Sequence, residues 1–123
     1  MVKKLLVFLI IVNTVSLYSQ TYTMSNGSLS VCGGTFLDPG GNANYIDSSD
    51  FTQTLCSSSG KCIAISFQSF GLENGYDFLR IYDGATTTSA QFSGSPFTGN
   101  VPPGIIKSTT GCLTLVFTSD YSF

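Results

Sequence analysis

The chain has 123 residues, the length of a single domain, with five basic residues, seven acidic residues and no histidine. So few basic residues argue against nucleic-acid binding, which needs clustered lysine and arginine to neutralise phosphates. The lack of histidine excludes Ser-His-Asp and Cys-His catalysis. We therefore expect a protein that is not an enzyme.

Residues 1–19 are predicted to be a signal peptide, because Lys3 and Lys4 precede an apolar run from Leu5 to Val12. The run is shorter than the about 20 residues of a membrane-spanning helix, so the mature chain is expected to have no span. We expect a secreted, extracellular protein whose mature form has a net charge of −4, from three basic and seven acidic residues. Two tripeptides fit the cleavage site, Thr14-Val15-Ser16 and Leu17-Tyr18-Ser19.

The mature chain is predicted to be an all-β domain over 31–123, preceded by a lead-in over 20–30. No stretch has a helical period, and Gly, Ser, Thr and Asn interrupt the sequence about every 8 to 12 residues, as in a sandwich of short strands. "DPGGN" at 38–42 indicates a turn. Further connections are expected at 73–75, 83–89 and 101–104.

Three stretches alternate between apolar and polar residues, which predicts strands with one buried face. They cover residues 61–70, 77–83 and 112–120. The residues expected to face the core are Ile63, Ile65, Phe67, Leu79, Ile81, Leu113, Leu115 and Phe117.

Four cysteines in a secreted chain predict two disulfides, and four cysteines allow three connectivities. Their wide spacing and the lack of histidine argue against a zinc site. Cys62 and Cys112 each occupy the less apolar face of a predicted strand. If those strands are neighbours, a Cys62–Cys112 bridge would join them and leave Cys32–Cys56 as the second pair, which is the pairing we favour.

Three motifs, taken together and in order, resemble the CUB domain family. They are "VCGGTFLDPGGNANY" at 31–45, "IAISFQSFGLENGYDFLRIYDG" at 63–84 and "LTLVFTSD" at 113–120. The resemblance implies an antiparallel β-sandwich of the CUB-like jelly-roll type. It also implies a non-catalytic extracellular module that binds other proteins or, in some members, carbohydrate.

The resemblance also implies a calcium site. The metal ligands of the calcium-binding members correspond to Glu73, Asp77 and Asp120, with the backbone carbonyl of Ser122 as a fourth. Calcium takes about 6 to 8 oxygen ligands, a requirement that carboxylates and carbonyls meet. Arg80 is not expected to neutralise this cluster, because it points to the opposite face of its strand from Asp77.

Two features depart from the family. The family places cysteines in the regions that read "ENGYD" and "QFSGSPF" here, and neither contains one. The family also continues past Ser-Asp into a final strand, whereas this sequence stops at Phe123. We therefore expect either a fragment truncated at its C-terminus, which is the interpretation we favour, or a sandwich that lacks its C-terminal edge strand and exposes an open edge.

The leading hypothesis is calcium-dependent binding of an extracellular protein, a basic side chain of which approaches the carboxylates. Asn74, Tyr76 and Tyr121 are the expected ligand contacts. One alternative is an accessory N-terminal domain of a larger secreted enzyme such as a peptidase. Another is a carbohydrate-binding module for a glycan. Tyr45 and Tyr82 either join a binding surface or pack in the fold, and the sequence leaves both options open.

Overall fold

The structure, a computed structural model, describes residues 7–12 and 20–122. Lys3, Lys4 and the two candidate cleavage tripeptides lie outside the described residues. The described residues contain no helix, and thus none that is long and apolar enough to cross a membrane. They form the strands β1 (Val7–Val12), β2 (Thr21–Thr23), β3 (Gly27–Val31), β4 (Gly34–Leu37), β5 (Asp50–Ser57), β6 (Ile63–Ser69), β7 (Phe78–Tyr82), β8 (Ile106–Lys107) and β9 (Cys112–Thr118).

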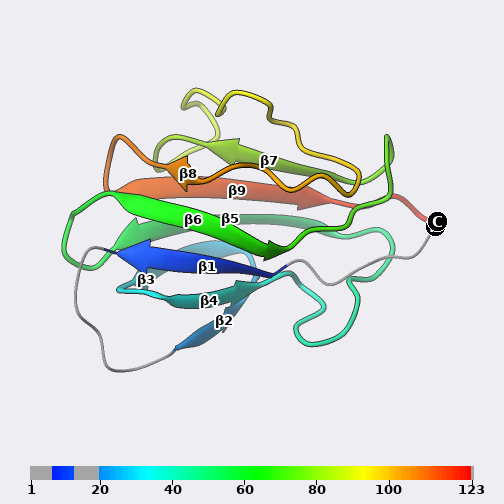
Figure 1. The fold of residues 1–123 in the computed structure, drawn as a ribbon, viewed down its shortest axis with the longest axis horizontal. Coiled ribbons are helices and arrows are strands. Elements are labelled where there is room, and N and C mark those ends of the chain that lie inside the picture. The colour runs from blue at the N-terminus through cyan, green and yellow to red at the C-terminus, as the bar shows by residue number, and fades with distance from the viewer. Residues whose placement is uncertain (1–6, 13–19, 123) are drawn as a thin grey trace.

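The strands form two sheets that pack face to face as a β-sandwich (Figure 1). One sheet has the order β2-β4-β1-β6-β8 and the other the order β3-β5-β9-β7. Two pairs are parallel, β2 with β4 and β3 with β5, and the other pairs are antiparallel. The predicted all-β sandwich is confirmed, with two parallel pairs that the sequence did not indicate.

The alternating stretches form the strands that line the core. Leu113, Leu115 and Phe117 are fully buried on one face of β9, and Leu79 and Ile81 are fully buried on β7. The opposite sheet contributes buried side chains to the same cluster, among them Phe36, Ile63 and Ile65. Burial of each such side chain stabilises a fold by about 1.5–3 kcal/mol, so the period-2 pattern marks the main source of stability.

The N-terminal segment takes a place inside the first sheet. β1 pairs with β4 on one side and with β6 on the other, and Ile10 is buried in the core. The predicted lead-in, residues 20–30, supplies β2 and β3, one to each sheet. Residues 20–30 are therefore integrated into the sandwich, and residues 7–12 of the predicted signal peptide form a strand of the uncleaved chain.

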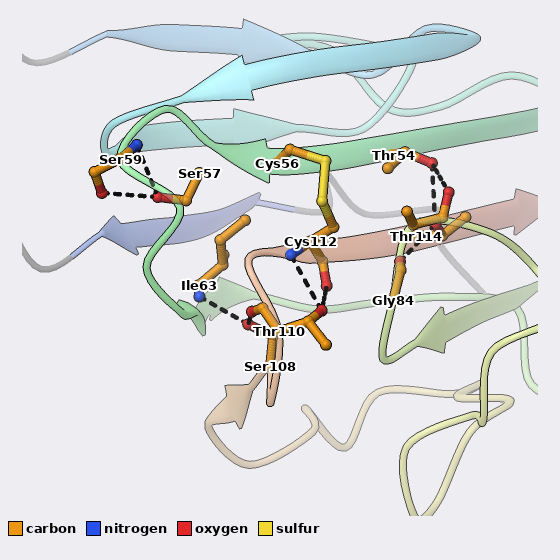
Figure 2. The surroundings of a disulfide bond; sticks show 11 residues. Thr54, Cys56, Ser57, Ser59, Ile63, Gly84, Ser108, Thr110, Cys112 and Thr114 are labelled. Carbon is orange, nitrogen blue, oxygen red and sulfur yellow. Dashed lines mark hydrogen bonds between the residues drawn. A yellow bond between two sulfur atoms is a disulfide. The ribbon is translucent and has the colours of Figure 1, made fainter.

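The disulfide prediction is wrong. Cys56 bonds to Cys112, so neither the predicted Cys32–Cys56 pair nor the predicted Cys62–Cys112 pair forms (Figure 2). The two bonded residues lie opposite each other on the neighbouring strands β5 and β9. Cys62 precedes β6, which lies in the other sheet, and its thiol is exposed. The expected Cys62–Cys112 bridge assumed that β6 and β9 are neighbours, and they are not.

The strand directions define two ends of the sandwich. β6 and β9 both point toward the right of Figure 1, the end at which residues 119–122 follow β9. The loops that lead into these two strands, residues 58–62 and 108–111, lie at the opposite end. Residues 70–77 and 119–122, which carry the predicted metal ligands, are thus separated from residues 58–62 and 108–111 by the length of the strands.

Candidate metal centre

Three separate connections bring the predicted carboxylates together at one end of the sandwich. Glu73 lies in the loop that follows β6, Asp77 immediately precedes β7, and Asp120 follows β9. β7 and β9 are antiparallel neighbours with Phe78 opposite Thr118, which places Asp77 next to the chain that leaves β9. The Asp120 N–H donates a hydrogen bond of 3.0 Å to Asp77 Oδ1.

The three carboxylates form a compact cluster, which we call the acidic cluster. One ligand oxygen from each of Glu73, Asp77 and Asp120 lies within 4.8 Å of the others. Asp77 is fully buried, and the other two side chains are half-buried. Two carboxylates about 4 Å apart repel each other by roughly 4 kcal/mol at an effective dielectric constant near 20, so a bound cation would stabilise this arrangement.

A tight turn returns the chain from Glu73 to Asp77. The carbonyl oxygen of Glu73 accepts hydrogen bonds from the N–H groups of Tyr76, at 3.2 Å, and Asp77, at 3.0 Å. Gly75 has a φ of 81° in this turn, a left-handed conformation that glycine adopts without steric cost. The turn fixes the spacing of the two carboxylates along the chain.

Tyr45, for which the sequence left both packing and binding open, is buried beside the acidic cluster and supports it. Its hydroxyl donates a hydrogen bond of 2.6 Å to Asp77 Oδ2 and accepts one of 3.3 Å from the Glu73 N–H. Its ring packs edge-on against Phe117, with centroids 4.9 Å apart. Burial, together with the hydrogen bond to Asp77, raises the pKa of Tyr45 above its ordinary value. Tyr45 therefore packs in the fold and orients Asp77.

The loop after Tyr45 fastens the segment that carries Asp120. Ser48, with a left-handed φ of 56°, donates its N–H to the Asp120 carbonyl oxygen at 2.6 Å. The Ser119 hydroxyl accepts a 2.8 Å hydrogen bond from the Ser49 N–H and donates one of 2.8 Å to the Ile46 carbonyl. No periodic pattern in the sequence identifies these contacts, because they join loops that lie far apart along the chain.

The other predicted site residues take different places. Ser122 donates its N–H to Asp120 Oδ1 at 3.0 Å, which brings its backbone beside the acidic cluster. Tyr76 and Tyr121 are exposed, at 61% and 83%. Asn74 lines a depression of about 400 Å³ with Thr98, Gly99, Asn100 and Val101, and none of the three carboxylates lines it.

Arg80 and Asp83 lie outside the cluster. The guanidinium of Arg80 lies over the ring of Phe78, 5.5 Å from its centroid. Asp83 follows β7 at the opposite end, where its carboxylate accepts two hydrogen bonds from Thr109. The position of Arg80 agrees with the prediction that it does not neutralise the acidic cluster.

The donor set fits a hard divalent cation. Every candidate ligand is an oxygen atom, from carboxylates on three loops and from the nearby backbone of Ser122, and calcium binds such oxygens in flexible geometry. Zinc and other softer metals favour sulfur and imidazole ligands, which are absent from this set. A buried ionised carboxylate such as Asp77 needs compensation by hydrogen bonds or opposite charge, and a cation would supply the charge.

Comparison with known proteins agrees with this architecture. The family model for the CUB domain matches residues 19–123. Cubilin from Canis lupus familiaris is 33% identical over 106 residues, an alignment that covers 77% of this chain and 3% of that protein. The chain thus spans a small part of the length of this relative.

A solved structure has the same fold. The crystal structure of the MASP-1 CUB2 domain bound to Ca²⁺ superposes with a TM-score of 0.54 and 24% sequence identity, covering 64% of this chain and 71% of that one. At this level of identity the likeness establishes the fold alone. With its two-sheet architecture and the family match over residues 19–123, the chain belongs to the CUB domain family.

Proposed function

We propose that this protein is a secreted, non-catalytic module that binds an extracellular protein through a calcium ion. CUB domains are typically extracellular protein-interaction modules and are generally not catalytic. The proposed metal ligands are the carboxylates of Glu73, Asp77 and Asp120 and the backbone carbonyl of Ser122. The observation that carries the proposal is the approach of the three carboxylates to within 4.8 Å, with Asp77 fully buried.

The calcium ion would order the loops at this end of the sandwich. Each carboxylate comes from a different connection, so a single ion would hold three chain segments together. The MASP-1 CUB2 domain, which shares this fold, is bound to Ca²⁺ in its crystal structure, and this supports calcium as the cation. A basic side chain of the partner would then approach the carboxylates, whose charge one calcium ion does not fully neutralise.

The surface around the acidic cluster supports a protein partner. Exposed apolar and aromatic side chains lie on the loops that carry or fasten the ligands: Ile46, Tyr76 and Tyr121. Tyrosine side chains near the centre of an interface often contribute strongly to protein binding. Tyr76 and Tyr121 flank two of the ligands in sequence, so they would contact whatever approaches the ion. Asn74, on the neighbouring depression, would be a peripheral contact.

We propose that residues 1–19 are removed on secretion. The cleavage would also remove β1 and leave β4 and β6 without the strand between them. The mass of the protein recovered from the growth medium tests this proposal directly. A mass that corresponds to a chain starting at Gln20 is expected, and recovery of the chain with its first 19 residues intact would contradict the proposal.

Thermal unfolding with calcium and with a chelator tests the metal site. Calcium at 100 times its dissociation constant should add about 2.7 kcal/mol to the free energy of unfolding. For a domain of this size that gain corresponds to a rise in melting temperature of about 10 °C. The measurement is repeated with magnesium, which demands near-octahedral geometry and should stabilise the protein less.

Two substitutions separate a specific site from a general charge effect. Asp77→Asn removes one charge from the acidic cluster and keeps the size of the side chain, and we expect it to abolish the calcium-dependent rise. Asp83→Asn removes the same charge at the opposite end and should keep the rise. An equal response of both variants to calcium would contradict the proposed site.

A further inference from the structure

A cleft of about 540 Å³ lies at the end of the sandwich opposite the acidic cluster, and we call it the basic cleft. It is formed mainly by the loops that lead into β6 and β9. Its lining residues are Gly60, Lys61, Cys62, Ala64, Lys107, Thr109, Thr110 and Gly111. The volume lies within the usual range of small-molecule sites, about 300–1,000 Å³.

Hydrogen bonds and the disulfide hold the two loops in place (Figure 2). The Ser108 hydroxyl accepts the Ile63 N–H at 2.8 Å and donates to the Thr110 carbonyl oxygen. The Ser57 N–H donates to the Gly111 carbonyl oxygen at 2.7 Å. The Cys56–Cys112 bond joins β5 to β9 where these loops begin and end. A ligand would therefore meet walls that are already ordered, which reduces the entropic cost of binding.

The charge of the cleft is opposite to that of the protein. Lys61, Arg80 and Lys107 are the basic residues of the described chain, and two of them, Lys61 and Lys107, line this cleft. None of the seven acidic residues lines it. Two ammonium groups in a concave site focus a positive potential on an otherwise negative surface and attract anions.

Asp83 is a carboxylate that contacts the cleft residue Thr109 from outside the cleft. Both oxygens of Asp83 accept hydrogen bonds from Thr109, from its N–H at 2.9 Å and from its hydroxyl at 2.8 Å. The Thr110 hydroxyl in turn hydrogen-bonds the backbone of Cys112. Both threonine hydroxyls are thus engaged within the protein, and the lysine ammonium groups are the charged donors that a ligand would meet.

We propose that the basic cleft binds a small ligand that carries an oxyanion group, such as a sulfate, phosphate or carboxylate on a sugar-sized molecule. Lys61 and Lys107 hold the oxyanion, and the walls contributed by Gly60, Ala64 and Gly111 accommodate the uncharged part. This site is independent of the calcium site, because the two sets of residues do not overlap and lie at opposite ends of the strands.

Titration of the purified protein with glucose 6-sulfate tests the proposal, with glucose as the uncharged control. Binding is followed by the amide NMR signals of residues 60–62 and 109–111. A second readout is the rate at which iodoacetamide alkylates the exposed Cys62, measured on its own peptide by mass spectrometry. We expect glucose 6-sulfate to shift the signals and to slow the alkylation several-fold, and glucose to do neither. Glucose 6-phosphate and glucuronate identify the preferred oxyanion.

Matched variants show whether the cleft lysines bind the anion. Lys61→Gln combined with Lys107→Gln should weaken glucose 6-sulfate binding at least tenfold. Arg80→Gln removes a positive charge elsewhere and should change the affinity less than twofold, and the circular dichroism of each variant verifies its fold. Unchanged affinity in the double lysine variant, or equal binding of glucose, would overturn the proposal. Asp77→Asn and a chelator should leave glucose 6-sulfate binding intact. Failure of the calcium proposal could therefore be distinguished from failure of the anion proposal.

Discussion

The two ends of the sandwich hold their charges in opposite ways. At one end Asp77 is fully buried, accepts hydrogen bonds from Tyr45 and Asp120, and lies against two further carboxylates. At the other end Lys61 and Lys107 are exposed to water on the edge of the basic cleft. A buried charge needs a partner for the fold to be stable, whereas an exposed charge is already hydrated.

The difference predicts two kinds of ligand binding. A cation at the acidic cluster should contribute to folding stability, because it compensates carboxylates that the fold has removed from water. An anion at the basic cleft should bind more weakly, since the lysines lose favourable hydration when they bind it, and should therefore stabilise the protein less at the same ligand concentration. Variants that affect one end and leave the other intact test this comparison.

The largest losses of stability are expected from substitutions of buried residues on β9, the strand that runs from one end of the sandwich to the other. Phe117 and Leu113 are both fully buried on this strand, and Phe117 contacts Tyr45. Phe117→Ala should lower the free energy of unfolding by about 3–5 kcal/mol and Leu113→Ala by about 2–5 kcal/mol. Urea unfolding and calcium titration check both variants.

Only Phe117→Ala should also weaken calcium binding, because it removes the ring against which Tyr45 packs. Leu113→Ala serves as the control with a similar loss of stability. A comparable loss of calcium affinity in the two variants would mean that Tyr45 does not position Asp77.

Loss of the disulfide should weaken anion binding at the basic cleft and leave calcium binding at the acidic cluster unchanged. Cys56→Ser combined with Cys112→Ser should reduce stability by about 2–4 kcal/mol, as for other disulfides that close a long loop. The affinity for glucose 6-sulfate should fall several-fold, because Cys112 follows directly on the cleft loop. Calcium titration of the same variant should give the wild-type affinity, and a large change there would contradict the independence of the two ends.

The smallest change in ligand affinity is expected from a substitution of Asp83. Asp83→Asn removes a negative charge near the basic cleft and keeps an oxygen that can accept the Thr109 N–H. A unit charge about 8 Å away in water changes an interaction by roughly 0.5 kcal/mol, which corresponds to about a twofold higher affinity for glucose 6-sulfate. A loss of anion binding would show instead that Asp83 is needed to hold Thr109 in place.

Three of the strands that line the core could be predicted because their apolar and polar residues alternate, as in a strand with one buried face. The alternation in 61–70, 77–83 and 112–120 corresponds to β6, β7 and β9 within a few residues at each end. β2 to β5 are rich in Gly, Ser and Thr, and the alternation of apolar and polar residues did not predict them as strands. Alternation indicates which face of a strand is buried, but it does not indicate which other strand lies next to it in the sheet.

The disulfide pairing could not be predicted from the sequence, because it depends on which strands are neighbours. Cys56 and Cys112 pair because β5 and β9 are neighbours, and β5 was not among the predicted strands. The carboxylates Glu73, Asp77 and Asp120 could be named from the family motif, and the structure brings them together. The role of Tyr45 as a support for Asp77 could not be predicted, because it rests on contacts with Asp77 and Phe117, which lie far away along the chain.

The central claim is that the acidic cluster binds calcium. Isothermal titration calorimetry of the chelator-treated protein with calcium measures this binding directly, with Asp77→Asn and Asp83→Asn titrated in parallel. We expect one calcium ion per chain for the wild-type protein and for Asp83→Asn, and no detectable binding for Asp77→Asn. Wild-type protein that takes up no calcium, or Asp77→Asn that binds it as well as wild type, would contradict the account.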